Sequence, residues 1–397
     1  MISRTGQPLE SQKATQTTSF VWKTIDEAFE YSRRHGAGIP ADRSLFDFIR
    51  ERVVQKGLSV EDQAECLEFS RVWGSYVGDA VETQSLRFFW LEECPDESIT
   101  FVASTYRGIL RLLATAALRA AEIRYNTPVL HVQRQSRPGP DPGQTPGRVR
   151  VTTHDGTYAF DQIVVTCPLG WLKRNKAAAF TPSLPERLTQ AIDNISYGRL
   201  EKVYITFPEA FWSSTATATA SASTTVFQDP IYTPSPSTNP WNQDCFALNT
   251  LPEGTAHPTL LFYLYGANAT AVVQRIACLT PQTPEYNNVL DALFRPIYAR
   301  LPGFNTSSPS CTPQAFRATT WQADPYAGHG SYCNFQVGLQ AGDEDLAVLR
   351  DGDGLRDSGV WFAGEHTAPV EALGTTTGAL TSGERVANDI ARMNMQL

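Results

Sequence analysis

The strongest constraint on the fold is a segment near the end of the chain that reads as a strand, a glycine turn and a helix. Val360-Trp-Phe-Ala-Gly-Glu-His-Thr367 is an apolar run that stops at Gly364 and continues with a carboxylate. Thr375-Thr-Thr-Gly-Ala-Leu-Thr-Ser-Gly-Glu384 then begins with small residues. Gly364 and Gly378 lack a Cβ, so the backbone can approach a bound ligand closely there. A strand that leads through such a turn into a helix is typical of α/β proteins.

Two interpretations of this segment remain open from its residues. The backbone N–H groups of residues 375–377 lie at an expected helix start, where the macrodipole is positive and favours negative charge. That arrangement suits a flavin, whose reduced ring carries negative charge. The alternative is an ordinary strand-to-helix turn without a ligand.

Four further segments accompany this one along the chain: Val164-Val-Thr-Cys-Pro-Leu-Gly-Trp-Leu-Lys173, Tyr197-Gly-Arg-Leu-Glu-Lys-Val-Tyr204, Phe211-Trp212 and Trp321-Gln-Ala-Asp-Pro-Tyr326. Together they resemble the flavin-containing amine oxidases, the family of monoamine oxidases, polyamine oxidases and lysine-specific histone demethylases. The resemblance covers residues 20–392. It implies a mixed α/β fold of two interleaved domains: an incomplete, Rossmann-like FAD-binding domain, and a substrate domain with a mixed sheet flanked by helices.

One family feature has no counterpart in this sequence. Members of the family open with a strand, a Gly-x-Gly-x-x-Gly turn and a helix. This chain opens with the polar Met1-Ile-Ser-Arg-Thr-Gly-Gln-Pro8. His35-Gly-Ala-Gly-Ile-Pro40 follows a helical pattern, which predicts a helix end and a turn. We therefore expect a family member without the N-terminal dinucleotide-binding unit.

The apolar pattern predicts the elements of both domains, since two cores are expected for 397 residues. Helices are expected within 20–75, with Ser44 as an N-cap, and over 105–121, with Leu110, Leu113, Ala117 and Leu118 on the buried side. Strands are expected at 127–133, 148–153, 157–160, 162–166, 200–207 and 259–265, with a hairpin turn at Asp155-Gly156. The predicted FAD-binding domain takes 101–175 and 352–397, and the substrate domain takes 20–100 and 176–351. Residues 213–225 form a low-complexity loop.

Composition limits the partners that we expect. A net charge of −8 argues against nucleic acid or an anionic membrane. The seven cysteines are odd in number and lack metal-ligand spacing, so no metal site is predicted. The first 20 residues lack a secretory signal, and no apolar stretch reaches the roughly 18 residues of a membrane helix. We expect a cytoplasmic protein that acts on a small molecule.

Lys202 is the candidate catalytic residue. It lies in an alternating strand pattern, which by itself would also fit the solvated face of an edge strand. The resemblance of Tyr197-Gly-Arg-Leu-Glu-Lys202 implies that this lysine holds a water against the flavin and takes part in oxygen reactivity and imine hydrolysis. Burial would lower its pKa and let it act near neutral pH.

Aromatic side chains are the candidate substrate-binding residues. The resemblance implies that Trp321, Tyr326 and Tyr332 line the space in which the amine is aligned with the flavin, and aromatic rings also attract cations. Plain core packing is the alternative for such rings. Ser331 stands where monoamine oxidases carry a cysteine bonded to the flavin, so the resemblance implies a non-covalent flavin.

The remaining candidates are cofactor contacts that the resemblance implies. Glu365, after Gly364, would hold the ribityl or pyrophosphate part, and Thr376, Thr377 and Gly378 would face the isoalloxazine. Contacts near the adenine and ribose are implied for Val129, Thr166 and Pro168.

Two functions stay open from the sequence. One is FAD-dependent oxidation of a primary amine or polyamine to an imine and aldehyde, with O2 reduced to H2O2. The other is a flavin-free binding module or inactive fragment, because the missing unit normally anchors FAD. Glu82, Glu92 and Glu93 could line a polyamine entry, although solvated loops carry such charges as well.

Overall fold

The computed structural model describes residues 1–93, 102, 105–134, 149–213 and 224–395. The chain divides into two compact units. Unit 1 consists of Met1–Glu93, Pro168–Trp171 and Asn194–Asp343. Unit 2 consists of Cys94–Cys167, Leu172–Asp193 and Glu344–Leu397. Compared with the predicted FAD-binding domain, unit 2 also includes residues 94–100, 176–193 and 344–351, whereas residues 168–171 belong to unit 1.

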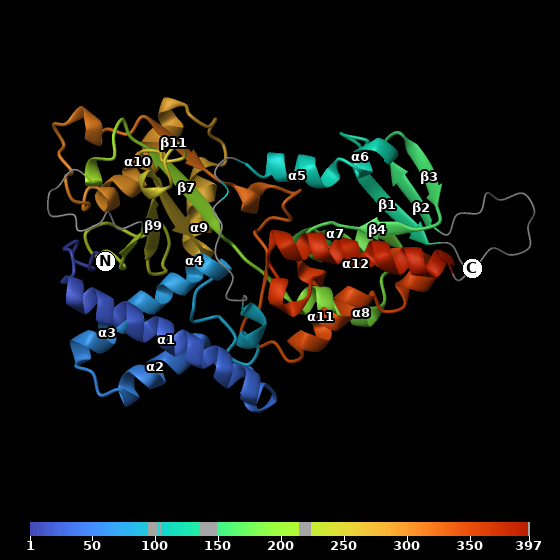
Figure 1. Ribbon diagram of the computed structural model, residues 1–397, viewed down its shortest axis with the longest axis horizontal. Helices are drawn as coiled ribbons and strands as arrows, with labels where there is room; N and C mark the ends of the chain where they lie inside the picture. Colours follow the sequence, from blue (N-terminus) through green and yellow to red (C-terminus); the bar gives the residue numbers. More distant parts are fainter. Residues whose placement is uncertain (94–101, 103–104, 135–148, 214–223, 396–397) are drawn as a thin grey trace, which may run out of the picture. The chain divides into compact units, whose positions relative to one another are not determined.

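Unit 1 is built around a five-stranded antiparallel sheet with the order β11-β7-β10-β9-β8. Its strands are β7 (Glu201–Thr206), β8 (Thr224–Phe227), β9 (Gln243–Ala247), β10 (Thr259–Leu264) and β11 (Ala315–Ala318). Helices α9 (Gly266–Ile276) and α10 (Pro284–Tyr298) cover one face (Figure 1). A small pair, β6 (Ser196–Tyr197) with β12 (Cys333–Asn334), completes the strands described in this unit.

The two faces of this sheet differ in burial. In β7, Val203 and Ile205 are fully buried and pack into the core that α9 and α10 close. Lys202 and Tyr204 alternate with them and are half-buried on the opposite face. This is the period of two expected for a strand. Because side chains alternate between the two faces of β7, the side chain of Lys202 points away from the main core.

A helical layer forms the rest of unit 1 and confirms the helices predicted within 20–75. It comprises α1 (Ser11–His35), α2 (Leu45–Gln55), α3 (Val60–Ser70) and the short α4 (Gly74–Val77). Ser44 caps α2 in a capping box with Asp47, as the sequence predicts for an N-cap. Helix α1 ends at His35, and Gly36–Gly38 form a 3-10 turn, as expected.

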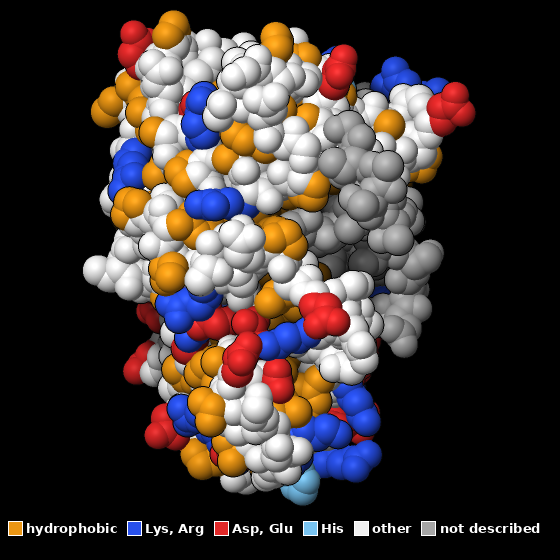
Figure 2. All heavy atoms as spheres, turned by 90° about the vertical axis from the view of Figure 1, so that its left-hand side faces the viewer, with side chains coloured by type: hydrophobic (Ala, Val, Ile, Leu, Met, Phe, Trp, Pro, Cys, Tyr) orange, Lys and Arg blue, Asp and Glu red, His pale blue; other side chains and the backbone are white. Residues whose placement is uncertain are grey.

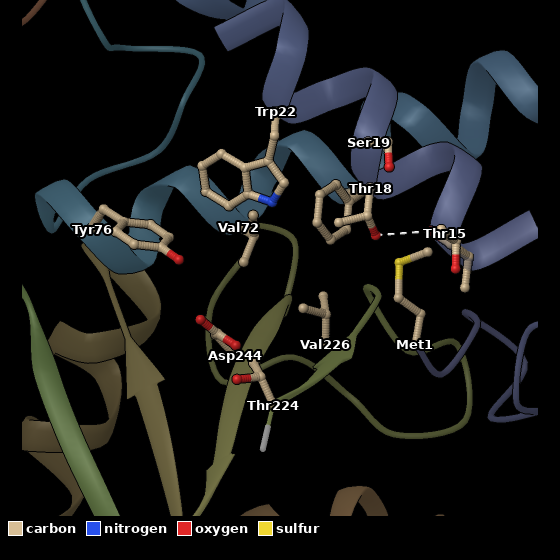
Figure 3. Close-up of a pocket in the computed structure, with 12 residues that line it drawn as sticks. Met1, Thr15, Thr18, Ser19, Trp22, Val72, Tyr76, Thr224, Val226 and Asp244 are labelled. Carbon is tan, nitrogen blue, oxygen red and sulfur yellow. Dashed lines mark hydrogen bonds between the residues drawn. The ribbon is translucent and has the colours of Figure 1, made fainter. Parts of the chain in front are cut away.

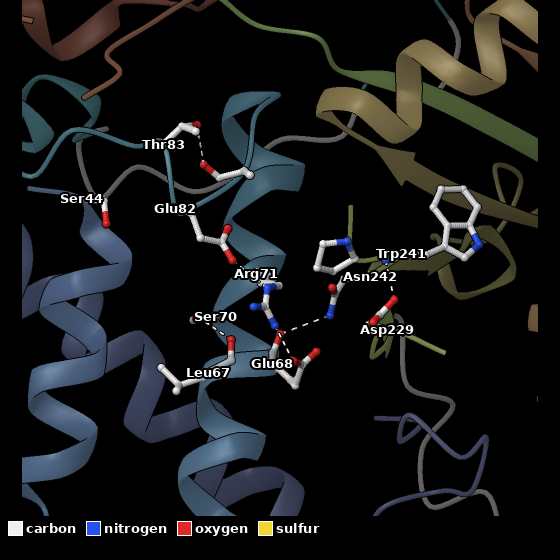
Figure 4. Close-up of polar contacts among 12 residues, drawn as sticks. Ser44, Leu67, Glu68, Ser70, Arg71, Glu82, Thr83, Asp229, Trp241 and Asn242 are labelled. Atoms are coloured by element: carbon white, nitrogen blue, oxygen red, sulfur yellow. Dashed lines mark hydrogen bonds and ion pairs between the residues drawn. The ribbon is translucent and has the colours of Figure 1, made fainter. Parts of the chain in front are cut away.

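A polar cluster fastens α3 to the start of β9 (Figure 4). Arg71 pairs with Glu68 and, at 2.8 Å from Nε, with Glu82. The side-chain amide of Asn242 donates to the carbonyl oxygen of Glu68 at 3.3 Å. Charge-assisted bonds of this kind are stronger than neutral ones. The two ion pairs of Arg71 strengthen the helical layer itself, and the bond from Asn242 to Glu68 links this layer to the strand that follows Asn242.

Unit 2 contains the predicted strand meander. Its sheet has the order β3-β2-β1-β5, and a parallel pair joins β4 to β13. The strands are β1 (Val129–Arg134), β2 (Val149–Thr153), β3 (Gly156–Phe160), β4 (Ile163–Val165), β5 (Phe180–Thr181) and β13 (Val360–Phe362). The helices are α5 (Tyr106–Ala114), α6 (Ala117–Ala120), α7 (Leu169–Ala179), α8 (Glu186–Asn194), α11 (Gly342–Asp351) and α12 (Thr376–Met395). The division between the units passes through α7 and α11.

The helix predicted over 105–121 is wrong in two respects. It is broken into α5 and α6, and the residues expected on its buried side, Leu110, Leu113, Ala117 and Leu118, are exposed. Leu110 is 61% and Leu113 54% exposed. The helical period gave the correct apolar face, but none of the described elements of the chain covers it.

The predicted low-complexity loop at 213–225 lies mostly outside the described residues, at 214–223. Its last two residues, Thr224 and Thr225, belong to β8, so the loop ends earlier than predicted. No helix in the described part of the chain is long and apolar enough to cross a membrane. On the face drawn in Figure 2, acidic and basic side chains lie close together, with apolar side chains scattered among them.

Candidate functional site

Lys202 belongs to a row of side chains on the less buried face of the unit 1 sheet. Strand register pairs it with Tyr263 of β10, and Tyr263 with Asp244 of β9. Directly paired residues of antiparallel strands project to the same face. With strands about 4.8 Å apart, the backbones of Lys202 and Asp244 lie roughly 10 Å apart.

Two aromatic rings hold the ammonium group of Lys202. Its Nζ lies 5.0 Å from the ring centre of Tyr263 and 5.9 Å from that of Trp321. Burial lowers the pKa of Lys202 because desolvation disfavours the charged form. No Asp or Glu pairs with it within the described residues. Lys202 is therefore a half-buried lysine with an increased neutral fraction, as the sequence interpretation required.

A buried carboxylate beside Lys202 fixes the position of Trp321. Glu201 is 1% exposed, and its carboxylate accepts bonds from the hydroxyl of Thr319 at 2.5 Å and from two backbone N–H groups. Those groups belong to Trp321, at 3.2 Å, and Gln322, at 2.9 Å, in the 3-10 turn Trp321–Ala323. Burial raises the pKa of Glu201, while these hydrogen bonds oppose the shift. The carboxylate thus ties the strand carrying Lys202 to the turn carrying its aromatic neighbour.

The two predicted tyrosines lie in different surroundings. The side chain of Tyr326 is 79% exposed and is not part of the Lys202 cluster. The hydroxyl of Tyr332 donates to the carbonyl oxygen of Tyr76 in α4. Ser331 accepts a bond from the N–H of Leu200 at 3.4 Å. Tyr332 and Ser331 thus link the segment before β12 to the elements around the sheet.

In unit 2, the turn after β13 contains a buried histidine without hydrogen bonds. His366 is 1% exposed, and neither ring nitrogen has a partner among the described residues. Burial lowers its pKa to about 4, so the ring is neutral at physiological pH. The carboxylate of Glu365 lies 3.9 Å from Nδ1. Gly364 has φ +149°, and a Cβ there would lie 2.8 Å from the His366 ring.

The start of α12 consists of exposed residues. Thr376 and Thr377, its first two residues, are exposed, and the first N–H groups of a helix have no acceptor within it. The N–H of Gly378 donates to Oγ1 of Thr375 at 2.9 Å. Gly378 itself is buried, and a Cβ there would lie 1.9 Å from the carbonyl oxygen of Ala372. Packing against the preceding turn therefore requires glycine at this position, whether or not a ligand is bound.

Three further predicted contacts lie near strand ends. Val129, 48% exposed, begins β1. Thr166 is exposed directly after β4. The carbonyl oxygen of Pro168 accepts a hydrogen bond from the N–H of Trp171 at 2.9 Å, at the start of α7. Pro168 belongs to unit 1. The implied roles of all three remain predictions.

Sequence reasoning missed Glu201, Tyr263 and Asp244. Only strand register could have found the last two, because they lie 61 and 42 residues from Lys202 in sequence. The acidic residues suggested for a polyamine entry have partners within the protein, and their role at an entry stays a prediction. Glu82 pairs with Arg71, as described above, Glu93 pairs with Arg33, and Glu92 accepts the N–H of Phe335 at 3.1 Å.

Among the described residues, no group of three or more His, Cys, Asp or Glu side chains could hold a metal ion. Six cysteines, all in the described part of the chain, are free thiols: Cys66, Cys167, Cys245, Cys278, Cys311 and Cys333. The thiol of Cys245 is fully buried, and burial raises its pKa.

The fold and these residues define a mixed α/β protein of two units, with a half-buried lysine among aromatic rings in one and a strand, turn and helix start in the other. The sequence profile described as flavin containing amine oxidoreductase matches residues 27–391. The chain belongs to this family of oxidoreductases, which confirms the resemblance.

Known relatives and structures agree with this assignment. Protein FLOWERING LOCUS D of Arabidopsis thaliana is 31% identical over 253 residues, covering 62% of this chain and 27% of the relative. Human peroxisomal N(1)-acetyl-spermine/spermidine oxidase is 28% identical over 292 residues, covering 71% of this chain and 53% of the relative. This chain therefore spans about half or less of the length of these relatives.

A solved structure of putrescine oxidase bound to putrescine is similar in fold. It has a TM-score of 0.62 at 16% identity, covering 97% of this chain and 77% of that one. At this identity the similarity concerns the fold alone, and it confirms the predicted mixed α/β class.

Proposed function

We propose that this protein oxidises a primary amine or polyamine with a non-covalently bound FAD, giving an imine that hydrolyses to an aldehyde. Unit 1 would bind the amine and unit 2 the cofactor. The observation that carries the proposal is the half-buried Lys202 with its ammonium group between Tyr263 and Trp321. A lysine that serves only as the solvated face of a strand would not need a carboxylate such as Glu201 to fix its aromatic neighbour.

The residues of unit 2 fit a flavin. The ring nitrogens of His366 are buried without partners, and a buried polar group in that state calls for an unseen partner. The backbone amides of the exposed residues Thr376 and Thr377 would donate to the isoalloxazine, and Glu365 would hold the ribityl or pyrophosphate part. When bound, a flavin supplies the two-electron oxidation of the carbon beside the amine and passes the electrons to O2, giving H2O2.

The side chains of unit 1 have three roles in this proposal. The rings of Trp321 and Tyr263 orient the amine and attract its charge. Lys202 holds a water for imine hydrolysis, and in its charged form it stabilises negative charge that develops on oxygen. Ser331, where a cysteine would form a covalent bond, supports a cofactor that is held only by non-covalent contacts.

Absorbance of the purified chain, before and after addition of FAD, tests the proposal. We expect flavin bands at about 380 and 450 nm that remain after removal of free FAD. Acid precipitation should release all the colour, and amines should produce H2O2. Colour that stays with the precipitated protein would contradict non-covalent binding, and a colourless chain that yields no peroxide would contradict the proposal as a whole.

Substitution of Lys202 tests its role separately. In the flavin-loaded protein, Lys202→Met should slow reoxidation by O2 much more than anaerobic reduction by an amine, because the charge acts on the oxygen half of the reaction. Stopped-flow absorbance measures both steps. Lys23→Met, an exposed position in α1, is the control and should leave both unchanged. Equal slowing of both steps would remove Lys202 from this role.

A second candidate function is a flavin-free binding module. The observation in its favour is the exposed apolar face of α5, where Ile109, Leu110 and Leu112 are 42%, 61% and 75% exposed. Exposed apolar patches often mark protein interaction sites. The two candidates separate in one measurement, because a binding module would show no flavin bands after reconstitution and no amine-dependent peroxide.

A further inference from the structure

A pocket of about 430 Å³ lies in unit 1 between the helical layer and strands β8 and β9 (Figure 3). Trp22 of α1 and Tyr76 of α4 lie on one side, and Val226 and Asp244 on the other. Among the described residues that line it, Asp244 is the only Asp, Glu, Lys or Arg. The pocket wall thus combines apolar side chains with the hydroxyl groups of Thr15, Thr18, Ser19 and Thr224, and it holds one carboxylate.

Asp244 lacks the partners that buried carboxylates normally have. It is 2% exposed, and its Oδ1 is buried without a hydrogen-bond partner among the described residues. No described Lys or Arg forms an ion pair with it. Figure 3 shows the carboxylate pointing into the pocket, toward Tyr76. A buried ionised group without a partner is costly, so this position is poised to gain a positive partner.

The opposite wall provides aromatic surface for such a partner. The rings of Trp22 and Tyr76 meet edge to face, with centres 5.5 Å apart, and Tyr76 stacks on Trp73 at 5.7 Å. Aromatic rings attract organic cations, and tryptophan does so most strongly. Inorganic cations such as Ca²⁺ require six or more oxygen ligands and usually several carboxylates, and this wall has one carboxylate. The wall chemistry therefore favours an organic cation.

We propose that Asp244, Trp22 and Tyr76 form a binding site for a protonated organic ammonium group, with its alkyl chain against the apolar wall. The site deepens the proposed function and rests on it for the natural ligand, which would be an amine substrate. Strand register places Asp244 in the same row as Tyr263 and Lys202. A substrate with two amino groups could thus keep one charged at Asp244 while the other reacts.

Isothermal titration calorimetry of the full chain without flavin tests the site, with 1-aminobutane as the probe and butan-1-ol as its neutral counterpart. At about pH 8.5 the amine is protonated. We expect 1-aminobutane to bind, and Asp244→Asn to weaken its binding at least about tenfold because the charge is lost while the shape is kept. Binding of butan-1-ol should be weak and unchanged. Glu253→Gln, which removes one exposed charge of unit 1 outside the pocket, should leave both unchanged.

A second variant, at Trp22, tests the same site if Asp244→Asn does not fold. Trp22→Leu should weaken 1-aminobutane binding by roughly threefold and leave butan-1-ol unaffected. Equal binding to wild type and Asp244→Asn proteins with the same melting temperature would overturn the site, as would equal affinity for amine and alcohol. The titration needs no flavin. A chain that binds 1-aminobutane through Asp244 but forms no peroxide would refute the proposed function alone, and the reverse result would refute only the site.

Discussion

Helix α1 of unit 1 and helix α5 of unit 2 are both amphipathic, but only α1 buries its apolar face. In α1, Val21 and Ile25 are 0% and 1% exposed and pack in one core with residues of α2 and α3. In α5 of unit 2 no residue is buried, and Leu112 is 75% exposed. An apolar stripe therefore specifies a helix and its inward face, but it does not supply the surface that covers that face.

The same contrast holds for polar groups. In unit 1, the buried carboxylate of Glu201 has three donors within the same unit. In unit 2, the buried ring of His366 has none among the described residues. Buried polar groups are normally paired, so the Glu201 carboxylate has no capacity left for a ligand, whereas the ring of His366 can still bind another molecule or segment.

Removal of the Glu201 carboxylate should give the largest loss of stability. Glu201→Ala leaves three donors without an acceptor, which we expect to cost roughly 3–5 kcal/mol of unfolding free energy. Glu201→Gln keeps one carbonyl acceptor and should cost less. Urea unfolding measures both, with Glu253→Ala as an exposed control. A loss no larger than that of the control would mean that unit 1 does not depend on this carboxylate.

The pH dependence of stability should contain a large contribution from Asp244. Burial raises its pKa from 3.8 to about 7. Between these two pKa values the folded protein holds a proton that the unfolded chain releases. The stabilisation of the folded state by protonated Asp244 is therefore complete below pH 3.8 and is lost as the pH rises to about 7. The loss amounts to at most about 4 kcal/mol.

Asp244→Asn should remove this loss. The neighbouring Tyr76 and Tyr263, whose pKa values burial raises to about 12, do not titrate in this range. Urea unfolding of wild type and Asp244→Asn between pH 5 and 8 measures the difference. Parallel stability curves for the two proteins would show that Asp244 has an ordinary pKa.

Gly378 tests the packing of unit 2. Gly378→Val would place a Cβ 1.9 Å from the carbonyl oxygen of Ala372, and we expect a loss of about 1–3 kcal/mol. Gly383 lies in the same helix with nothing within 4 Å of its Cβ position, so Gly383→Ala should stabilise by about 0.5–1 kcal/mol. Thermal unfolding separates the two. If the flavin-loaded Gly378→Val protein has a lowered flavin midpoint potential, Gly378 also has a role at the cofactor in addition to its packing role.

Polar substitutions on α5 should have the smallest effect on stability. Leu110→Gln with Leu113→Gln should change the unfolding free energy by only about 0.5 kcal/mol, because both side chains are exposed. Ile25→Ala, on the buried face of α1, should cost roughly 2–5 kcal/mol. The α5 variant should also bind less of a dye for apolar surface. A loss on α5 as large as that of Ile25→Ala would show that its face is covered in solution.

Sequence patterns located the elements that local chemistry specifies. Period-two alternation predicted the strand carrying Lys202, and Ser44 before a helical pattern predicted the N-cap of α2. The motif at 360–384 predicted both the turn at Gly364 and the helix after it. These features depend on residues within about four positions of one another, so the sequence displays them directly.

Tertiary structure decided which distant residues share a surface. Strand register brings Tyr263 and Asp244 into the row of Lys202, and a carboxylate next in sequence to Lys202 turns to the other face to hold the turn of Trp321. The burial of Leu110 could not be read from its helical period, because burial depends on a covering element elsewhere. Charge pairing is also decided in three dimensions: Glu82 has an arginine partner and Asp244 has none among the described residues, although both are acidic residues in the same unit.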